Sequence, residues 1–352
     1  MLKTDDFDYD LPHELIAQTP LKHREKSRMM ILNKKTGDVE HKIFENIVDY
    51  IKPGDCVVLN DTKVIPARLY GHREGKQEAI EVLLVKQLED DKWQTLVKPG
   101  KKTKIGTKVI FQEGLLEAEV VDILPEGERV FKFKYKGIFN EILDKLGTVP
   151  LPPYITEKLD DKDMYQTVYC KNPGSAAAPT AGLHFTKEIL KQLEDKDVNI
   201  VYVTLHVGIG TFRPVRVEDV TKHNMHSEWF VISKEACDTI NDTRKRGNRV
   251  FCIGTTSCRV LETATKDDGI IYPMSCETSI FIYPGYKFKM VDALLTNFHL
   301  PKSTLIMLVS ALAGKDHILN AYKIAVDQKY RFFNIIITCC MWCTFIKTHH
   351  YI

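Results

Sequence analysis

The sequence TKEILKQLEDKDVNIVYVTL, residues 186–205, predicts a helix followed directly by a strand. Thr186 stands in the position of a helix cap, and NIVYVTL supplies the β-branched and aromatic residues that favour a strand. The same alternation continues toward the C-terminus. Further helices are predicted in KEACDTINDTRKR (234–246), TSCRVLETAT (256–265) and PKSTLIMLVSALAG (301–314), and further strands in RVFCIG (249–254) and SIFIYPG (279–285). Alternating strands and helices indicate a layered α/β domain.

Residues that start and stop helices support these assignments. Ser233 precedes the helix in KEACDTINDTRKR, and Gly247 follows it. The helix in PKSTLIMLVSALAG begins with proline in its first turn and stops at Gly314, the usual asymmetry of helix ends.

Residues 69–150 have a different character. The short apolar runs EVLLV, WQTLV, KVIF, EAEVV and RVFKFKY are separated by charged or glycine-containing turns, with little helical periodicity. In the last run Phe131, Phe133 and Tyr135 alternate with lysines, which fits a half-buried strand. Several short strands in succession predict a small β-barrel or sandwich.

Composition limits the class of protein. The 352 residues are 44% hydrophobic and 27% charged, as in an ordinary globular protein of two domains. The 49 basic and 47 acidic side chains nearly cancel, so an RNA site must be a local basic patch. The acidic start MLKTDDFDYDLP has no apolar signal region, and the nine cysteines are interpreted as reduced thiols. The longest apolar stretch, 332–346, falls short of the roughly 20 residues of a membrane span. We expect a cytoplasmic protein with no membrane contact.

The segment GSAAAPTAGLHFT, residues 174–186, is unusually rich in small residues. Such a stretch makes a poor core and a poor surface, but it lets the backbone approach a ligand closely. His184 lies at its end, just before the predicted helix. A tight loop packed on a neighbouring element is an equally good interpretation.

The segment GTTSCR, residues 254–259, stands after a predicted strand and at the start of a helix. Backbone N–H groups, the three hydroxyls of Thr255, Thr256 and Ser257, and the guanidinium of Arg259 suit a carboxylate or phosphate. The alternative is that these hydroxyls merely cap the helix.

Histidines form a third feature. His206 lies in LHVGIGTF, His223 and His226 in HNMHSE, and His299 in TNFHLP. The spacing of His223 and His226 suggests a metal, but no further ligand follows at zinc spacing, so we expect none. Histidines at strand ends beside polar loops serve as hydrogen-bond donors, or as acids and bases near neutral pH.

The turn KPGKKTK, residues 98–104, is basic and lies in the all-β segment. Lys98, Lys101 and Lys102 are candidate contacts to RNA phosphates. A solvated hairpin is the simpler interpretation of this turn.

Several blocks of sequence, some longer than ten residues, resemble one known family. They include NDTKVIPARL, PLPPYI, YQTVYCKNPGSAAAPTAGLHFT, VTLHVGIGTFRPV, HNMHSE, IGTTSCRVLE, IFIYPGY, TNFHLPKSTL and YRFF. In this order they resemble the S-adenosylmethionine:tRNA ribosyltransferase-isomerases of queuosine biosynthesis. The resemblance extends to about Phe333. It implies an α/β domain built from 1–68 and 151–352, with an inserted small β-barrel at 69–150.

The resemblance also implies a reaction. The substrate would be tRNA bearing 7-aminomethyl-7-deazaguanine, and S-adenosylmethionine would be consumed as a ribosyl donor rather than held as a cofactor. Adenine and methionine would leave, giving epoxyqueuosine, and we expect a monomer. A methyltransferase would require a glycine-rich turn after its first strand. The N-terminal strands lead to KPGD and NDTK instead, so the sequence disfavours a methyltransferase.

This chemistry requires a base, an acid for the departing adenine, and donors for an alkoxide. The candidates for proton transfer are His184, His206, His226, Glu228 and His299. The candidates for binding the methionine carboxylate or another part of the substrate are Thr255, Thr256, Ser257, Arg259, Arg213 and Asn297. The sequence does not rank the bases.

Three positions depart from the family pattern. Met164 replaces an arginine before YQTVY, and residues 276–279 read Cys-Glu-Thr-Ser in place of Gly-Trp-Thr-Asp. After Phe333 the chain continues NIIITCCMWCTFIKTHHYI, which resembles translation of an altered reading frame. The alternative function is therefore an impaired homologue that binds tRNA without turnover. An apolar, cysteine-rich tail is also an aggregation liability, so its removal would improve solubility.

Overall fold

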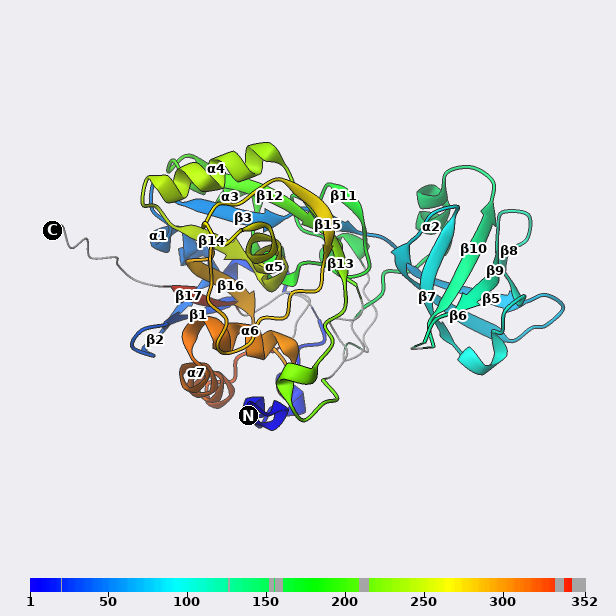
Figure 1. The fold of residues 1–352 in the computed structure, drawn as a ribbon, viewed down its shortest axis with the longest axis horizontal. Coiled ribbons are helices and arrows are strands. Elements are labelled where there is room, and N and C mark those ends of the chain that lie inside the picture. The colour runs from blue at the N-terminus through cyan, green and yellow to red at the C-terminus, as the bar shows by residue number, and fades with distance from the viewer. Residues whose placement is uncertain are drawn as a thin grey trace.

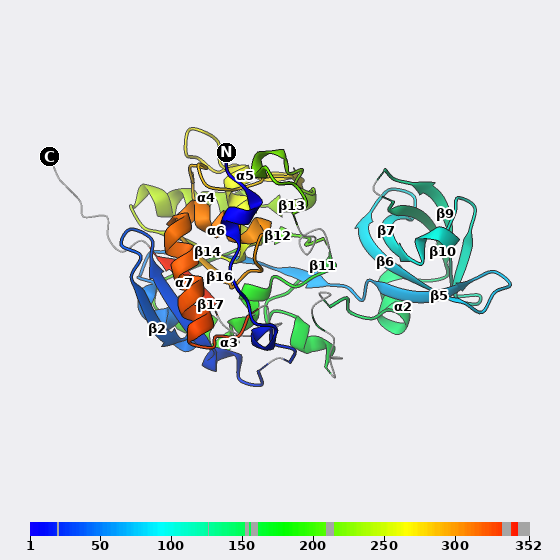
Figure 2. The same ribbon diagram turned by 90° about the horizontal axis from the view of Figure 1, so that it is seen from below.

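The computed structural model describes residues 1–19, 21–125, 127–151, 155, 161–208, 215–332 and 339–343. It consists of an α/β domain with a nine-stranded sheet and, to one side, a closed barrel of six strands (Figure 1). The view from below shows the same separation of the two bodies (Figure 2). The predicted fold class, an α/β domain with an inserted small β-barrel, is confirmed.

The large sheet combines strands from both ends of the chain. Its order is β15-β13-β12-β3-β14-β16-β17-β1-β2, and β12, β3, β14 and β16 run parallel at its centre. The strands are β1 Arg28–Asn33, β2 Val39–Ile43, β3 Cys56–Asn60, β12 Asn199–Leu205, β13 Glu228–Ile232, β14 Val250–Ile253, β15 Met274–Thr278, β16 Ala293–Asn297 and β17 Cys339–Cys343. The central strands are largely apolar because helices cover both faces of this part of the sheet.

Side chains of the central strands alternate between two cores. In β3, Cys56 and Val58 face one core, whereas Val57 and Leu59 face the other. The first core takes apolar residues from four helices, and the second takes them from two. The helices on the first face are α4 Lys234–Lys245, α5 Gly254–Ala264, α6 Thr304–Ala313 and α7 Lys315–Asp327, and those on the second are α1 Ile47–Tyr50 and α3 Lys187–Glu194.

Helix caps lie where the sequence predicts them, with one exception. The hydroxyls of Thr186 and Ser233 accept hydrogen bonds from backbone N–H groups in the first turns of α3 and α4. The third cap differs from the prediction, because α6 begins after Ser303 and not at Pro301. The Ser303 hydroxyl accepts the N–H of Ile306 at 3.3 Å, and Pro301 lies in the preceding turn.

The strand predicted in SIFIYPG is wrong. The strand of this region is β15, Met274–Thr278, which ends before that segment begins. β15 pairs with β13, so that Thr278 lies opposite Glu228. The apolar residues of SIFIYPG instead pack on the first core outside any strand, with Ile282 fully buried.

The barrel has the order β10-β7-β6-β5-β8-β9. Its strands are β5 Arg68–Arg73, β6 Ala79–Gln87, β7 Lys92–Lys98, β8 Lys108–Gln112, β9 Leu116–Ile123 and β10 Arg129–Tyr135. In β10, Phe131 and Phe133 are buried and Lys132 and Lys134 are exposed, as the alternating sequence predicts. The helix α2, Phe139–Leu146, adds Ile142 and Leu143 to the barrel core.

Two short strands lie where the chain passes between the domains. β4, Thr62–Val64, and β11, Asn172–Ser175, pair in parallel. No helix within the described residues is long and apolar enough to cross a bilayer.

Candidate active site

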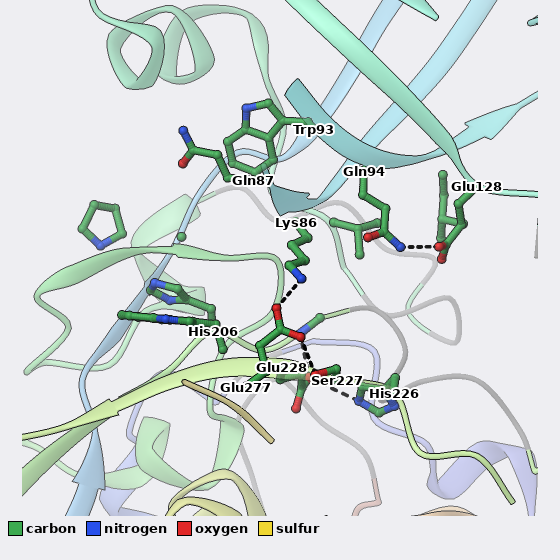
Figure 3. Close-up of a pocket in the computed structure, with 16 residues that line it drawn as sticks. Lys86, Gln87, Trp93, Gln94, Glu128, His206, His226, Ser227, Glu228 and Glu277 are labelled. Carbon is green, nitrogen blue, oxygen red and sulfur yellow. Dashed lines mark hydrogen bonds and ion pairs between the residues drawn. The ribbon is translucent and has the colours of Figure 1, made fainter. Parts of the chain in front are cut away.

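A cavity of about 740 Å³ lies between the barrel and the α/β domain (Figure 3). The barrel contributes Val85, Lys86, Gln87, Trp93, Gln94, Leu96 and Glu128. The α/β domain contributes Pro173, Gly174, His206, Gly208, His226, Ser227, Glu228, Trp229 and Glu277. The volume is in the range of pockets that take a nucleoside-sized ligand. Three of the five residues predicted for proton transfer line it.

His206 follows the last residue of β12 and is fixed on both sides of its ring. Its Nδ1 lies 2.8 Å from the hydroxyl oxygen of Thr62, and the ring stacks on Trp229 with centroids 5.1 Å apart. Burial lowers the pKa of His206, and Asp61 opposes this only in part. The imidazole is therefore neutral at pH 7 and can accept a proton.

Gly174 explains the small-residue loop in part. Its φ is +146°, and a Cβ at this position would lie 2.7 Å from Nε2 of His206. Only glycine lets the backbone come this close to the imidazole. The loop thus brings its backbone against a histidine that lines the cavity.

Glu228 is the buried charge of the site. Its carboxylate pairs with the guanidinium of Arg259, accepts the N–H of Gly208 at 2.7 Å, and lies 3.3 Å from Nε2 of His226. Burial opposes ionisation, but Arg259, His226 and this N–H outweigh it and lower the pKa of Glu228 to about 2. Glu228 is thus a permanent carboxylate that orients His226. Arg259 also donates to the carbonyl of Thr278.

The predicted anion site at the start of α5 lies outside the cavity lining. The small-residue loop covers it, since a Cβ on Gly254 would be 3.8 Å from that of Ala181. None of the three hydroxyls caps the helix. In the described part of the chain, the Thr256 and Ser257 hydroxyls have no hydrogen-bond partner, and Thr255 is buried.

His184 is an interior histidine, outside the cavity lining. Its Nδ1 lies 3.1 Å from the Ser27 hydroxyl, its Nε2 lies 3.3 Å from Oδ1 of Asn297, and its ring stacks on Phe44. Burial lowers the pKa of His184 to about 4. His184 and Asn297 thus satisfy each other in the interior, which supports a structural role for both.

His299 is likewise buried and does not line the cavity. Its Nε2 lies 3.2 Å from the hydroxyl of Thr296, and its backbone N–H donates to the hydroxyl of Tyr322. Burial lowers the pKa of His299 to about 3. Arg213, predicted to contact the substrate, lies outside the described residues.

The basic turn of the barrel is exposed and lies outside the cavity lining. Lys98 ends β7, and Trp93, Gln94 and Leu96 of the same strand line the cavity. Lys101 and Lys102 follow in a short 3-10 turn, and Lys102 pairs with Glu78.

Sequence reasoning missed several members of the site. Thr62 and Trp229 position His206, while Lys86 and Glu277 form an ion pair across the cavity. Trp229 directly follows Glu228, a predicted site residue, so its position in the sequence could have indicated that it belongs to the site. No sequence feature indicates Lys86, because a strand sequence does not reveal which domain a residue at the barrel rim faces.

Among the described residues, no group of three histidines, cysteines or carboxylates could hold a metal ion. The His223 ring instead contacts Phe281 edge-on, with centroids 5.1 Å apart.

Comparison with known proteins identifies the family. The family model described as queuosine biosynthesis protein matches residues 4–335. The S-adenosylmethionine:tRNA ribosyltransferase-isomerases of Clostridioides difficile and Acetivibrio thermocellus are each 60% identical over 333 residues, covering 95% of this chain and 98% of theirs. The crystal structure of the S-adenosylmethionine tRNA ribosyltransferase from Thermotoga maritima is 38% identical, with a TM-score of 0.54, and the match covers 96% of this chain and 99% of that one. The chain therefore belongs to the queuosine biosynthesis family of S-adenosylmethionine:tRNA ribosyltransferase-isomerases, a family of transferase and isomerase enzymes.

Proposed function

We propose that this chain transfers the ribosyl group of S-adenosylmethionine to 7-aminomethyl-7-deazaguanine in tRNA and isomerises it. Epoxyqueuosine in tRNA, adenine and methionine are the products. The supporting observation is the cavity between the two domains, which brings His206, His226 and Glu228 together in a member of this family.

S-adenosylmethionine is a co-substrate in this proposal and not a resident cofactor. Its sulfonium acidifies the neighbouring ribose carbon, so a base must remove a proton there. We assign this step to Nε2 of His206, because the ring is neutral and Thr62 and Trp229 fix its orientation. A single chain contains both walls of the cavity, so a monomer suffices.

Adenine must take up a proton as it leaves. We assign the proton to His226, whose imidazole lies beside the permanent carboxylate of Glu228. A carboxylate that stays ionised near neutral pH can hold a neighbouring histidine in a fixed orientation through a hydrogen bond. Glu228 is therefore a positioning residue in this proposal, and Arg259 keeps it ionised.

The start of α5 remains our candidate for the methionine carboxylate. Its two hydroxyls without a partner in the described chain, on Thr256 and Ser257, are donors that a bound anion would satisfy. The loop 174–186 would have to move for an anion to reach them, since it covers this helix end. Arg259 is already paired with Glu228, so we assign it no substrate contact.

The alternative, an impaired homologue, depends on the tail beyond the family match. None of the described residues lining the cavity follows Phe332 in the sequence, which favours an active enzyme. The test is to incubate the chain with S-adenosylmethionine and tRNA carrying the aminomethyl precursor, and to measure adenine. Adenine above the no-protein control supports turnover. Retained tRNA binding without adenine supports the impaired homologue.

A further inference from the structure

A β-bulge in strand β6 of the barrel turns the side chain of Lys86 toward the α/β domain. In β6, Ile80, Val82 and Leu84 point inward, so strict alternation would place Lys86 inside the barrel as well. The pairing of β6 with β7 shifts register between Leu84 and Lys86. A bulge re-aims the side chains that follow it, and such bulges are frequent at barrel rims and beside active sites. Lys86 therefore lines the cavity and not the barrel core.

Across the cavity, Lys86 meets the α/β domain through one ion pair. Its ammonium contacts the carboxylate of Glu277, whose other oxygen accepts the Ser227 hydroxyl at 2.6 Å (Figure 3). The side chains of Lys86 and Glu277 are 41% and 40% exposed, so both remain open to solvent and to a ligand. An ion pair this exposed contributes little to stability and exchanges readily.

The charges around this pair are unfavourable to RNA. The described lining contains three carboxylates, on Glu128, Glu228 and Glu277, and Lys86 is its one lysine or arginine. Arg259, which does not line the cavity, neutralises the charge of Glu228 through an ion pair. An approaching phosphate is thus repelled by Glu277 and attracted by Lys86, and the lysine can pair with only one of them well.

We propose that Lys86 is a phosphate-binding residue that exchanges partners. It pairs with Glu277 in the free protein, and a backbone phosphate of the tRNA displaces that carboxylate when the target base enters the cavity. After the exchange Glu277 keeps the Ser227 hydroxyl as its partner. This inference rests on the proposed function, because it takes tRNA as the substrate.

If the exchange takes place, substitution of Lys86 weakens tRNA binding, whereas substitution of Glu277 strengthens it. Lys86→Ala removes the phosphate contact, so the Kd for an unmodified tRNA transcript rises about three- to tenfold at low salt. The slope of log Kd against log salt falls by about 0.7. Glu277→Gln removes the competing carboxylate, so tRNA binding becomes about two- to fivefold tighter. Fluorescence anisotropy across a salt series measures both.

The pair Lys26 and Glu45 provides a matched control, because it is another exposed lysine–glutamate pair and does not line the cavity. Lys26→Ala and Glu45→Gln are expected to leave the Kd and the salt slope unchanged. If Lys86→Ala and Glu277→Gln both weaken binding, the pair only holds the domains together, and the proposal is overturned.

The methionine carboxylate of S-adenosylmethionine is the other anion within reach. Binding of S-adenosylmethionine without tRNA, measured by calorimetry, separates the two sources. Loss of that binding in Lys86→Ala, with tRNA affinity unchanged, would overturn a phosphate site. Adenine release by the wild-type chain with no effect of either variant on tRNA affinity would overturn this inference and leave the proposed function intact. Absence of tRNA binding by the wild-type chain would overturn both.

Discussion

The orientation of His206 depends on a residue that has no side chain. Gly174 lies directly against Nε2, and its backbone has a φ of +146° that other residues rarely adopt. Gly174→Ala would displace the imidazole, because the added Cβ would lie 2.7 Å from Nε2 of His206. We expect adenine release to fall by about a hundredfold, since a displacement near 1 Å at a reacting group costs about that much.

The control for this substitution is Gly269→Ala. Gly269 also has a positive φ of +76°, but nothing lies within 4 Å of a Cβ there. Both variants lose about 1 kcal/mol or more through backbone strain, which thermal unfolding detects. Only Gly174→Ala should lose activity. Equal activities of the two variants would remove the reason for assigning the proton transfer to His206.

We expect His184 to affect stability, because its ring lies in the interior and outside the cavity lining. Its folded pKa is about 4, below the ordinary value of 6.5, because it is buried. As the pH falls below 6.5, the unfolded chain therefore binds the proton first. Its contribution to stability is complete above pH 6.5 and is lost progressively toward pH 4, with a slope of up to about 1.4 kcal/mol per pH unit.

This dependence is measurable by urea unfolding at several pH values between 7 and 4. The variant His184→Gln should show a shallower decline in the free energy of unfolding than the wild-type chain. His23→Gln is the control, since the His23 side chain is 72% exposed. A decline as steep in His184→Gln as in the wild-type chain would contradict the prediction.

At the scale of elements, the local sequence predicted the positions of several strands and helices correctly. β12 coincides with NIVYVTL, and the hydroxyls of Thr186 and Ser233 cap the helices they precede. The strand expected in SIFIYPG failed because strand position there is decided by pairing with β13, which no local pattern encodes. The helix α2 was missed, although Phe139, Ile142, Leu143 and Leu146 recur at helical spacing and Ile142 and Leu143 pack into the barrel core.

The last strand changes the expectation for the tail. β17 lies beyond the family match at 335, yet it pairs in parallel with β1 and antiparallel with β16. Removing it would leave β1 and β16 without a partner on the edges that now face β17. We therefore expect a chain ending at Phe333 to be less stable and less soluble, the reverse of what composition alone suggests.

A chain ending at Cys343 keeps β17 and is the appropriate control. Thermal unfolding and static light scattering of the three lengths decide the question. We expect the full chain and the chain ending at Cys343 to behave alike, and the chain ending at Phe333 to unfold several degrees lower, since about 1 kcal/mol shifts Tm by roughly 2–4 °C at this size. A higher Tm for the shortest chain would contradict this prediction and support the interpretation of the tail as an aggregation liability.

At the scale of the whole molecule, the cavity could not be predicted because its walls belong to different domains. The family motifs pointed to His206, His226 and Glu228, which the structure does bring together. Lys86 and Glu277, however, are 191 residues apart, and they meet only through the placement of the barrel against the α/β domain. Residue chemistry was thus readable from the sequence, whereas the relative position of the two domains was not.

The barrel itself has the connections expected of an insertion. Arg68 and Thr148 exchange two backbone hydrogen bonds, of 3.0 and 2.8 Å, so the chain enters and leaves the domain at one point. The barrel is closed and has a core of its own, whose members include Phe131 and Leu143.

We therefore expect a fragment of residues 65–149 to fold alone, with a cooperative thermal transition and dispersed amide NMR signals. Phe131→Ala should abolish both, because it removes about 3–5 kcal/mol from a domain of marginal size. A fragment that stays unfolded would mean that the barrel depends on the α/β domain for its stability.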